Sequence, residues 1–171
     1  MESVLDRVIK QNTENVNLLK TKDYNIFSVL QIQSKEVLIC RMIADLLNPR
    51  GQHGAGAEYL KIFLRDCLGM EKMDTKLADQ AIVTAEYAID DERRIDIVIE
   101  IGSYFLPIEV KIYAADQKSQ CFDYYQYAKR RDAQAKVYYL TLDGHRPGKD
   151  STSSGNRSVT EEDIVCLSFR G

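Results

Sequence analysis

The sequence lacks the patterns that mark several common kinds of functional site. Its four cysteines form no Cys-x-x-Cys pair and have no histidine nearby to complete a zinc site. Glycine-rich phosphate loops of the P-loop or dinucleotide type are absent as well. We therefore expect buried free thiols in place of metal ligands. The cysteines are Cys40, Cys67, Cys121 and Cys166.

Segments that would direct the chain into or across a membrane are also missing. No apolar run approaches the ~20 residues that span a bilayer. The first residues have neither the basic nor the apolar part of a signal peptide. Because unpaired cysteines suit a reducing compartment, we expect a cytoplasmic protein with no membrane partner.

The chain has no excess of positive charge. It contains 23 Lys and Arg against 26 Asp and Glu, which gives a formal net charge of −3. This charge provides no general attraction to nucleic acid. A local basic surface could still form, although such charges are more often a solvated helix end and loop. Its candidate residues are Lys129, Arg130, Arg131, Lys136, Arg146, Lys149 and Arg157.

What is present suffices for one globular domain. The 171 residues are 44% apolar, and chains of ~100–200 residues usually build a single core. Because the sequence shows no repeat, no low-complexity tract and no sign of a second domain, we expect residues 1–171 to form one domain. The sequence stops directly after a predicted strand, so we expect either a truncated chain or a naturally short one.

The clearest local pattern is a β-hairpin over residues 94–111. Two β-branched runs flank Gly102 and Ser103, and a Gly at the first central position suits a two-residue type II′ turn. This turn pairs Ile101 with Tyr104 and thereby sets the register of both strands.

Continuing that register places Asp96 opposite Glu109 on one face of the hairpin. At a separation of ~5 Å and an effective dielectric of ~20, two carboxylates repel by about 3 kcal/mol. Lys111 shares the face of Glu109 and offsets part of this charge, and a divalent ion with oxygen ligands would offset the rest. The alternative is an exposed edge hairpin whose charges are simply solvated.

Asp96, followed after twelve residues by Glu109-x-Lys111 on consecutive strands, resembles the active-site signature of the PD-(D/E)XK nuclease superfamily. Ile95 stands where the nominal motif has Pro. Downstream, residues 114–128 resemble the helix that follows the Glu-x-Lys strand in many members. This segment includes a Gln-x-x-x-Tyr element, formed by Gln120 and Tyr124, on one helix face.

Upstream, residues 36–54 are similar to the first helix and turn of a bacterial subfamily. That helix begins with a Glu, here Glu36, and ends in a Leu-Leu-x-Pro turn followed by His-Gly. The resemblance spans roughly residues 36–142. The sequence departs from the subfamily at Ile39 and Cys40, where His-Ser is frequent, and at Val110, where Asn is frequent; neither departure removes a presumed metal ligand.

The resemblance implies an α/β fold, a small mixed β-sheet flanked by helices in a restriction-endonuclease-like core, with extra N-terminal helices. Residues 143–158 are expected to form a long, mobile polar loop, and residues 160–163 a turn or short helix. An N-terminal helix is expected to carry Leu5, Val8, Ile9, Val16 and Leu19 on one face. Further helices are expected over residues 34–47, which begin at Ser34 as N-cap, over residues 117–131, and over residues 57–68, where Leu60, Phe63, Leu64 and Cys67 face inward. Besides the hairpin, strands are expected over residues 82–89, 136–142 and 164–169.

The resemblance also implies metal-dependent hydrolysis of phosphodiester bonds in nucleic acid, DNA in preference to RNA. Asp96, Glu109 and Glu36 would hold Mg²⁺, with Mn²⁺ as a substitute. Lys111 would orient water or stabilise the transition state, and Gln120 would position Lys111 or the phosphate. The alternative function is a catalytically silent module of the same fold that binds nucleic acid or a protein partner.

Three of these residues have simpler structural interpretations. Glu36 could be a favourable surface charge at a helix start. Glu86, a secondary site candidate on the strand over residues 82–89, could instead point outward and pair with Arg93 or Arg94. Tyr124 could support the helix or stack on nucleic acid, or be a half-buried aromatic residue. No motif specifies the form of the substrate, the oligomeric state or the pathway.

Overall fold

The computed structural model describes residues 35–71 and 73–169. The predicted N-terminal helix and Ser34 lie outside these residues. The helix expected from Ser34 begins at Glu36, and Lys35 occupies the N-cap position without a side-chain cap. The helices and strands are α3 (Glu36–Leu47), α4 (Glu58–Ile62), a π-helical turn (Phe63–Cys67), α5 (Thr75–Ala78), β1 (Ile82–Ala88), β2 (Arg94–Ile101), β3 (Tyr104–Lys111), α6 (Gln120–Arg131), β4 (Val137–Thr141), α7 (Lys149–Thr152), β5 (Ser153–Ser154), β6 (Arg157–Ser158), a 3₁₀ turn (Glu161–Asp163) and β7 (Ile164–Ser168).

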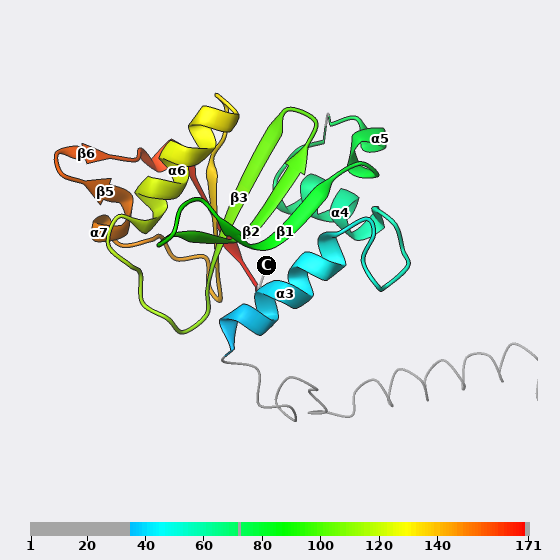
Figure 1. The fold of residues 1–171 in the computed structure, drawn as a ribbon, viewed down its shortest axis with the longest axis horizontal. Helices are drawn as coiled ribbons and strands as arrows, with labels where there is room; N and C mark the ends of the chain where they lie inside the picture. Colours follow the sequence, from blue (N-terminus) through cyan, green and yellow to red (C-terminus); the bar gives the residue numbers. More distant parts are fainter. Residues whose placement is uncertain (1–34, 72, 170–171) are drawn as a thin grey trace, which may run out of the picture. The chain divides into compact units, whose positions relative to one another are not determined.

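A five-stranded mixed sheet organises the described residues, in the order β1-β2-β3-β4-β7 (Figure 1). Strands β1, β2 and β3 are antiparallel neighbours, whereas β4 runs parallel to β3 and β7 runs parallel to β4. The parallel step from β3 to β4 crosses over through α6, as a parallel connection requires. The predicted α/β fold with a mixed sheet is confirmed.

The hairpin has the predicted register. Gly102 has a φ of 58°, which an L side chain rarely adopts, and Ser103 is not among the residues with positive φ. This is the pattern of a type II′ turn. Ile101 pairs with Tyr104, and the ladder continues up to the pair of Ile97 and Ile108.

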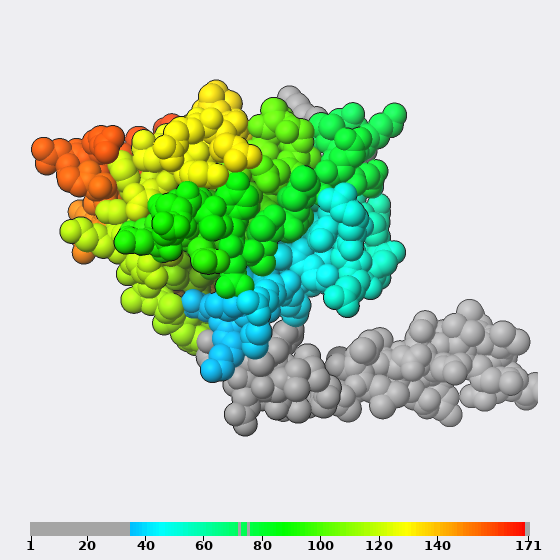
Figure 2. Space-filling model, viewed as in Figure 1, coloured from blue at the N-terminus to red at the C-terminus, as the bar shows by residue number. Residues whose placement is uncertain are grey.

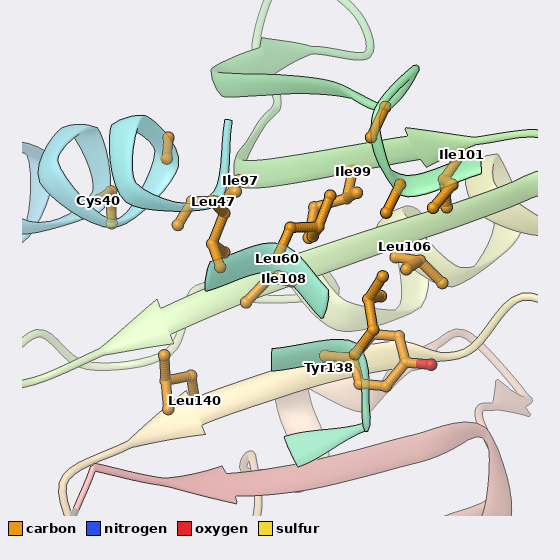
Figure 3. Close-up of a cluster of buried hydrophobic side chains, with 14 of the residues drawn as sticks. Cys40, Leu47, Leu60, Ile97, Ile99, Ile101, Leu106, Ile108, Tyr138 and Leu140 are labelled. Atoms are coloured by element: carbon orange, nitrogen blue, oxygen red, sulfur yellow. The ribbon is translucent and has the colours of Figure 1, made fainter. Parts of the chain in front are cut away.

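Each face of the sheet packs against a different helix because side chains alternate along each strand. Helix α3 contacts β1, β2 and β3, and α6 contacts β3 and β4. The cluster on the α3 and α4 side, drawn in Figure 3, includes Cys40, Leu47, Leu60, Ile97, Ile99, Ile101, Leu106, Ile108, Tyr138 and Leu140. The cluster on the α6 side includes Ile95, Val98, Phe105, Cys121, Phe122, Tyr124, Val137 and Tyr139.

The helix predicted over residues 57–68 changes geometry halfway. Its second part is π-helical, with the N–H of Leu68 donating to the carbonyl of Phe63 (3.2 Å). This wider turn changes the angular spacing of side chains, so the prediction that Cys67 faces inward is wrong, and Cys67 is exposed. Cys166 is partly exposed, and the prediction of burial holds only for Cys40 and Cys121; all four thiols are free.

Residues 143–158 are not a simple loop as predicted. They contain α7 and the short hairpin of β5 and β6. The segment bonds inward to the start of α6: the side chain of Ser151 is fully buried and accepts from the N–H of Cys121 (3.3 Å), and the backbone carbonyl of Ser153 accepts from Ser119 Oγ (2.7 Å). Hydrogen bonding thus orders a segment that its polar composition suggested would be loose. The short helix expected over residues 160–163 is confirmed by the 3₁₀ turn.

Candidate active site

Asp96 and Glu109 lie at the end of the hairpin ladder, next in register after Ile97 and Ile108. The ladder stops there because the Asp96 side chain enters it: Oδ2 of Asp96 accepts a hydrogen bond from the N–H of Val110 (2.8 Å). The carboxyl groups of Asp96 and Glu109 are close enough to influence each other's protonation. The structure therefore brings the two predicted carboxylates together.

Glu109 is the most constrained charged group of this site. Its exposed fraction is 1%, and neither carboxylate oxygen has an aligned hydrogen-bond donor. Lys111 Nζ lies 2.6 Å from Oε1, so the two side chains form a close ion pair. Burial, and then the nearby Asp96 carboxylate, raise the pKa of Glu109 well above its ordinary value, despite the attraction of Lys111.

The other two charges of the site respond to the same surroundings. Burial raises the pKa of Asp96, although the hydrogen bond from Val110 and the charge of Lys111 oppose the shift. Burial alone would lower the pKa of Lys111, but the carboxylates of Glu109, Asp96 and Glu36 together outweigh it and the pKa of Lys111 rises. Lys111 is therefore a protonated ammonium at neutral pH, paired with Glu109 and attracted by the nearby Asp96.

Glu36 has a different set of partners. Its Oε1 accepts hydrogen bonds from three consecutive backbone N–H groups, of Ile112 (2.7 Å), Tyr113 (2.8 Å) and Ala114 (2.9 Å). Burial tends to raise the pKa of Glu36, but the three hydrogen bonds together outweigh it and the pKa is lowered. An ionised Glu36 thus fastens the start of α3 to the end of β3, immediately after Lys111.

Gln120 and Tyr124 form a buried pair in α6. Gln120 Nε2 donates to Tyr124 Oη (3.1 Å), which in turn donates to the carbonyl of Arg94 on β2. With an exposed fraction of 1%, Tyr124 is neither half-buried nor available for stacking on nucleic acid. The amide of Gln120 bonds to Tyr124 and to the N–H of Gln117, not to Lys111.

Glu86 lies opposite Asp96 on the other side of β2, where the ladder of β1 and β2 is also interrupted. Its φ is 54°, and its carboxylate pairs with Arg41 of α3 (2.6 Å). The predicted alternative of a pair with Arg93 or Arg94 is therefore wrong. The local twist of β1 turns the side chain of Glu86 toward α3.

Arg93 and Asp116, which hold the loop between β3 and α6, were missed by the sequence analysis. Arg93 bonds to Asp123 (3.1 Å), Gln117 (2.9 Å) and the carbonyl of Lys118 (2.5 Å). Asp116 accepts from the hydroxyl of Tyr139 and the N–H of Gly148, both at 2.7 Å. No motif marked either residue, because their partners are backbone groups or distant in the sequence.

The donor set suits a hard divalent cation. Asp96 and Glu109 offer carboxylate oxygens, and those of Glu109 have no aligned donor. Mg²⁺ is commonly held by one or two carboxylates with water and phosphate oxygens completing its shell, so two carboxylates are sufficient. Over residues 35–71 and 73–169, no three Asp, Glu, His or Cys side chains are gathered to hold a metal ion, so Glu36 is not grouped with the other two.

Comparison with known proteins supplies the family. The PD-(D/E)XK nuclease superfamily, as represented by its family profile, matches residues 24–167. The chain belongs to the PD-(D/E)XK nuclease superfamily. Members of this superfamily are generally nucleases. No curated protein and no solved structure matched the chain.

Membership of the PD-(D/E)XK superfamily agrees with the mixed sheet and its flanking helices. It also agrees with the family resemblance expected from Asp96, Glu109 and Lys111. Within the part of the chain that the structure describes, no helix is both long and apolar enough to span a membrane.

Proposed function

We propose that this protein is a metal-dependent nuclease that hydrolyses phosphodiester bonds in nucleic acid, DNA in preference to RNA. The observation that carries the proposal is the buried Glu109 carboxylate, which lacks an aligned donor and lies beside Asp96 and Lys111. A buried ionisable cluster of this kind costs stability unless a cation or a substrate uses it. The four free thiols support action in a reducing compartment, the cytoplasm.

Asp96 and Glu109 would hold one or two Mg²⁺ ions, with Mn²⁺ as a substitute. A bound ion would supply a water of lowered pKa and neutralise charge on the phosphate oxygens. The Asp96 carboxylate is already oriented for this role by the hydrogen bond from Val110. Glu109 is oriented by its place in the sheet, because it pairs with Tyr139 of β4 and directly follows Ile108, which pairs with β2.

Lys111 would act on the attacking water or on the phosphate. An ammonium group has three donors, and the ion pair with Glu109 engages at most one of them. Because its pKa is raised, Lys111 serves as a hydrogen-bond donor and positive charge, not as a general base. It can orient a water molecule or stabilise charge that develops on the phosphate.

Glu36 and Gln120 would act as positioning residues. Glu36 fixes the backbone directly after Lys111 through three hydrogen bonds, and this favours support of the site over direct contact with a metal ion. Gln120 orders Tyr124, which anchors α6 to β2 beside Asp96.

The test is incubation of labelled duplex DNA, single-stranded DNA and RNA with the protein in Mg²⁺, in Mn²⁺ and in EDTA. We expect cleavage only with a divalent ion, and none with Asp96→Ala or Lys111→Ala. Glu100→Gln is the matched control, because Glu100 lies on the same strand as Asp96 but pairs with Arg131 (2.6 Å). Full activity in Asp96→Ala or Lys111→Ala would overturn the assignment.

A second candidate function is a catalytically silent module that binds nucleic acid or a protein. The absence of a three-residue ligand set from residues 35–71 and 73–169 favours it. A thermal-shift titration with Mg²⁺ or Mn²⁺ separates the two functions. An intact metal site is stabilised by about 2.7 kcal/mol when the ion is in 100-fold excess over Kd, whereas a silent module shows no shift and no cleavage.

A further inference from the structure

A groove of about 280 Å³ runs beside α6, between the turn that joins β1 to β2 and strand β6. Phe122, Gln126 and Arg130 line it at four-residue intervals, so they form one row along the helix. Arg157 of β6 lines the same groove. Figure 2 shows α6 and the β5–β6 hairpin as neighbouring surfaces of the molecule.

Two exposed arginines in this groove make cation–π contacts with aromatic rings and, among the described residues, form no ion pairs with carboxylates. The guanidinium carbon of Arg130 lies 5.6 Å from the ring centre of Tyr127, and that of Arg157 lies 5.2 Å from the ring centre of Phe122. Over the described ranges, neither guanidinium forms an ion pair or a hydrogen bond. Stacking fixes the plane of a guanidinium and leaves its N–H edge free for a phosphate.

This distinguishes the two arginines from other members of the basic surface considered in the sequence. Three of the other five members already have carboxylate partners and are less available to an outside anion. These three pairs are Lys129–Asp163, Arg131–Glu100 and Arg146–Glu161.

The acidic residues of the groove are occupied as well. Asp123 pairs with Arg93 (3.1 Å), and Oδ1 of Asp90 accepts the backbone N–H groups of Glu92 and Arg93. Arg130 and Arg157, which are unpaired among the described residues, therefore give the groove a net positive charge toward a ligand. An extended polyanion suits this groove better than an acidic side chain, because Arg157 stacks on Phe122, about two helical turns from Arg130, so the two charges do not converge on one point.

The row of side chains leads away from the candidate active site. Helix α6 packs on β3, which carries Glu109 and Lys111. From Gln120 to Arg130 the helix rises about 15 Å at 1.5 Å per residue. This equals the rise of four to five base pairs at about 3.4 Å each.

We infer that the α6 groove binds the phosphate backbone of nucleic acid, with Arg130 and Arg157 each contacting one phosphate and the phosphate at Arg130 lying several nucleotides from the scissile bond. The inference rests on the proposed function for the class of substrate only. The α6 groove would supply a local attraction for nucleic acid, which the net charge of −3 does not provide.

The test measures binding of labelled duplex DNA to the full chain carrying Asp96→Ala, over 50 to 200 mM salt. We expect Arg130→Gln and Arg157→Gln each to weaken DNA binding, and each variant to do so by the same factor whatever the base sequence of the DNA. Each should also reduce the slope of log K against log salt by about 0.9 for duplex or about 0.7 for single strands. Arg130→Lys and Arg157→Lys should restore the slope, and melting curves should establish that each variant is folded.

Arg65→Gln is the control for net charge, because Arg65 is already paired with Asp66. An equal loss in this control, or unchanged slopes in both groove variants, would overturn the inference. So would an absence of DNA binding, or binding of polyglutamate but not DNA. If the wild type cleaves DNA but the slopes of the groove variants are unchanged, the inference about the groove fails and the nuclease proposal stands. If the slopes change but the wild type does not cleave, the nuclease proposal fails and the inference about the groove stands.

Discussion

The ammonium nitrogen of Lys111 lies 2.6 Å from Oε1 of Glu109, a residue with only 1% of its surface exposed. One cation thus serves two neighbouring carboxyl groups, because Asp96 is next to Glu109. When both acids are ionised, the buried cluster carries an uncompensated negative charge. The metal-free protein therefore keeps a repulsion that a substitution can relieve.

Asp96→Asn should stabilise the metal-free protein and abolish cleavage. The amide oxygen can still accept from Val110, while the repulsion of Glu109 is removed; we expect a gain of about 1–2 kcal/mol in the free energy of unfolding at neutral pH. Urea denaturation in EDTA measures this gain. Glu100→Gln should change stability by less than about 1 kcal/mol, because it breaks a partly exposed ion pair with Arg131. A less stable Asp96→Asn variant would contradict this prediction.

The metal-free protein should become less stable as pH rises, because Glu109 loses its proton. Its pKa is raised well above 4.5 by burial and by Asp96, so the folded state holds the proton more tightly than the unfolded state. The stabilising contribution is complete below 4.5 and is lost as pH rises through the folded pKa. Relative to Glu109→Gln, the wild type should therefore lose stability from about pH 4.5 toward neutrality. Denaturation of both proteins across this range provides the measurement, and a constant difference would count against the prediction.

Divalent ions should bind more tightly as pH rises, because carboxyl groups must lose their protons to act as ligands. We expect Mg²⁺ or Mn²⁺ to release protons at mildly acidic pH, where the raised pKa values of Asp96 and Glu109 keep a proton in the pair. Calorimetry in two buffers with different ionisation enthalpies measures the number released. The heat should disappear with Asp96→Asn. Affinity that is independent of pH would argue against these two ligands.

Glu36→Ala should destabilise the fold by about 1–3 kcal/mol, because three backbone N–H groups lose their shared acceptor. Glu36→Gln keeps an acceptor oxygen and should lose less. The wild-type contribution is present above about pH 4.5 and is lost as pH falls through the lowered pKa of Glu36. Thermal melts of the three proteins at neutral and acidic pH measure these effects. Equal melting temperatures throughout would refute the positioning role.

The hairpin and its charged face could be predicted because the information is local. A glycine at the first turn position sets the register, and strand alternation then places Lys111 on the face of Glu109. The family resemblance extended this local prediction to helices on both sides of the sheet.

The surroundings of the site could not be predicted in the same way. Glu36 bonds to backbone N–H groups, which no residue type identifies, and Glu86 pairs with Arg41 across 45 positions. The burial of Tyr124 depends on how α6 rests on β2, and a helical pattern alone does not show this. Such contacts arise from tertiary packing, so the sequence left their partners open or assigned the wrong ones.

The bond from Glu36 to the end of β3 joins residues 76 to 78 positions apart in the chain. Contacts of such long sequence separation are costly to close in entropy and depend on the intervening chain. The backbone next to Lys111 is therefore fully fixed only when helix α3 packs against the hairpin. The proposed hydrolytic activity is accordingly expected only from the completed fold, so a partly synthesised or partly unfolded chain would not damage nucleic acid.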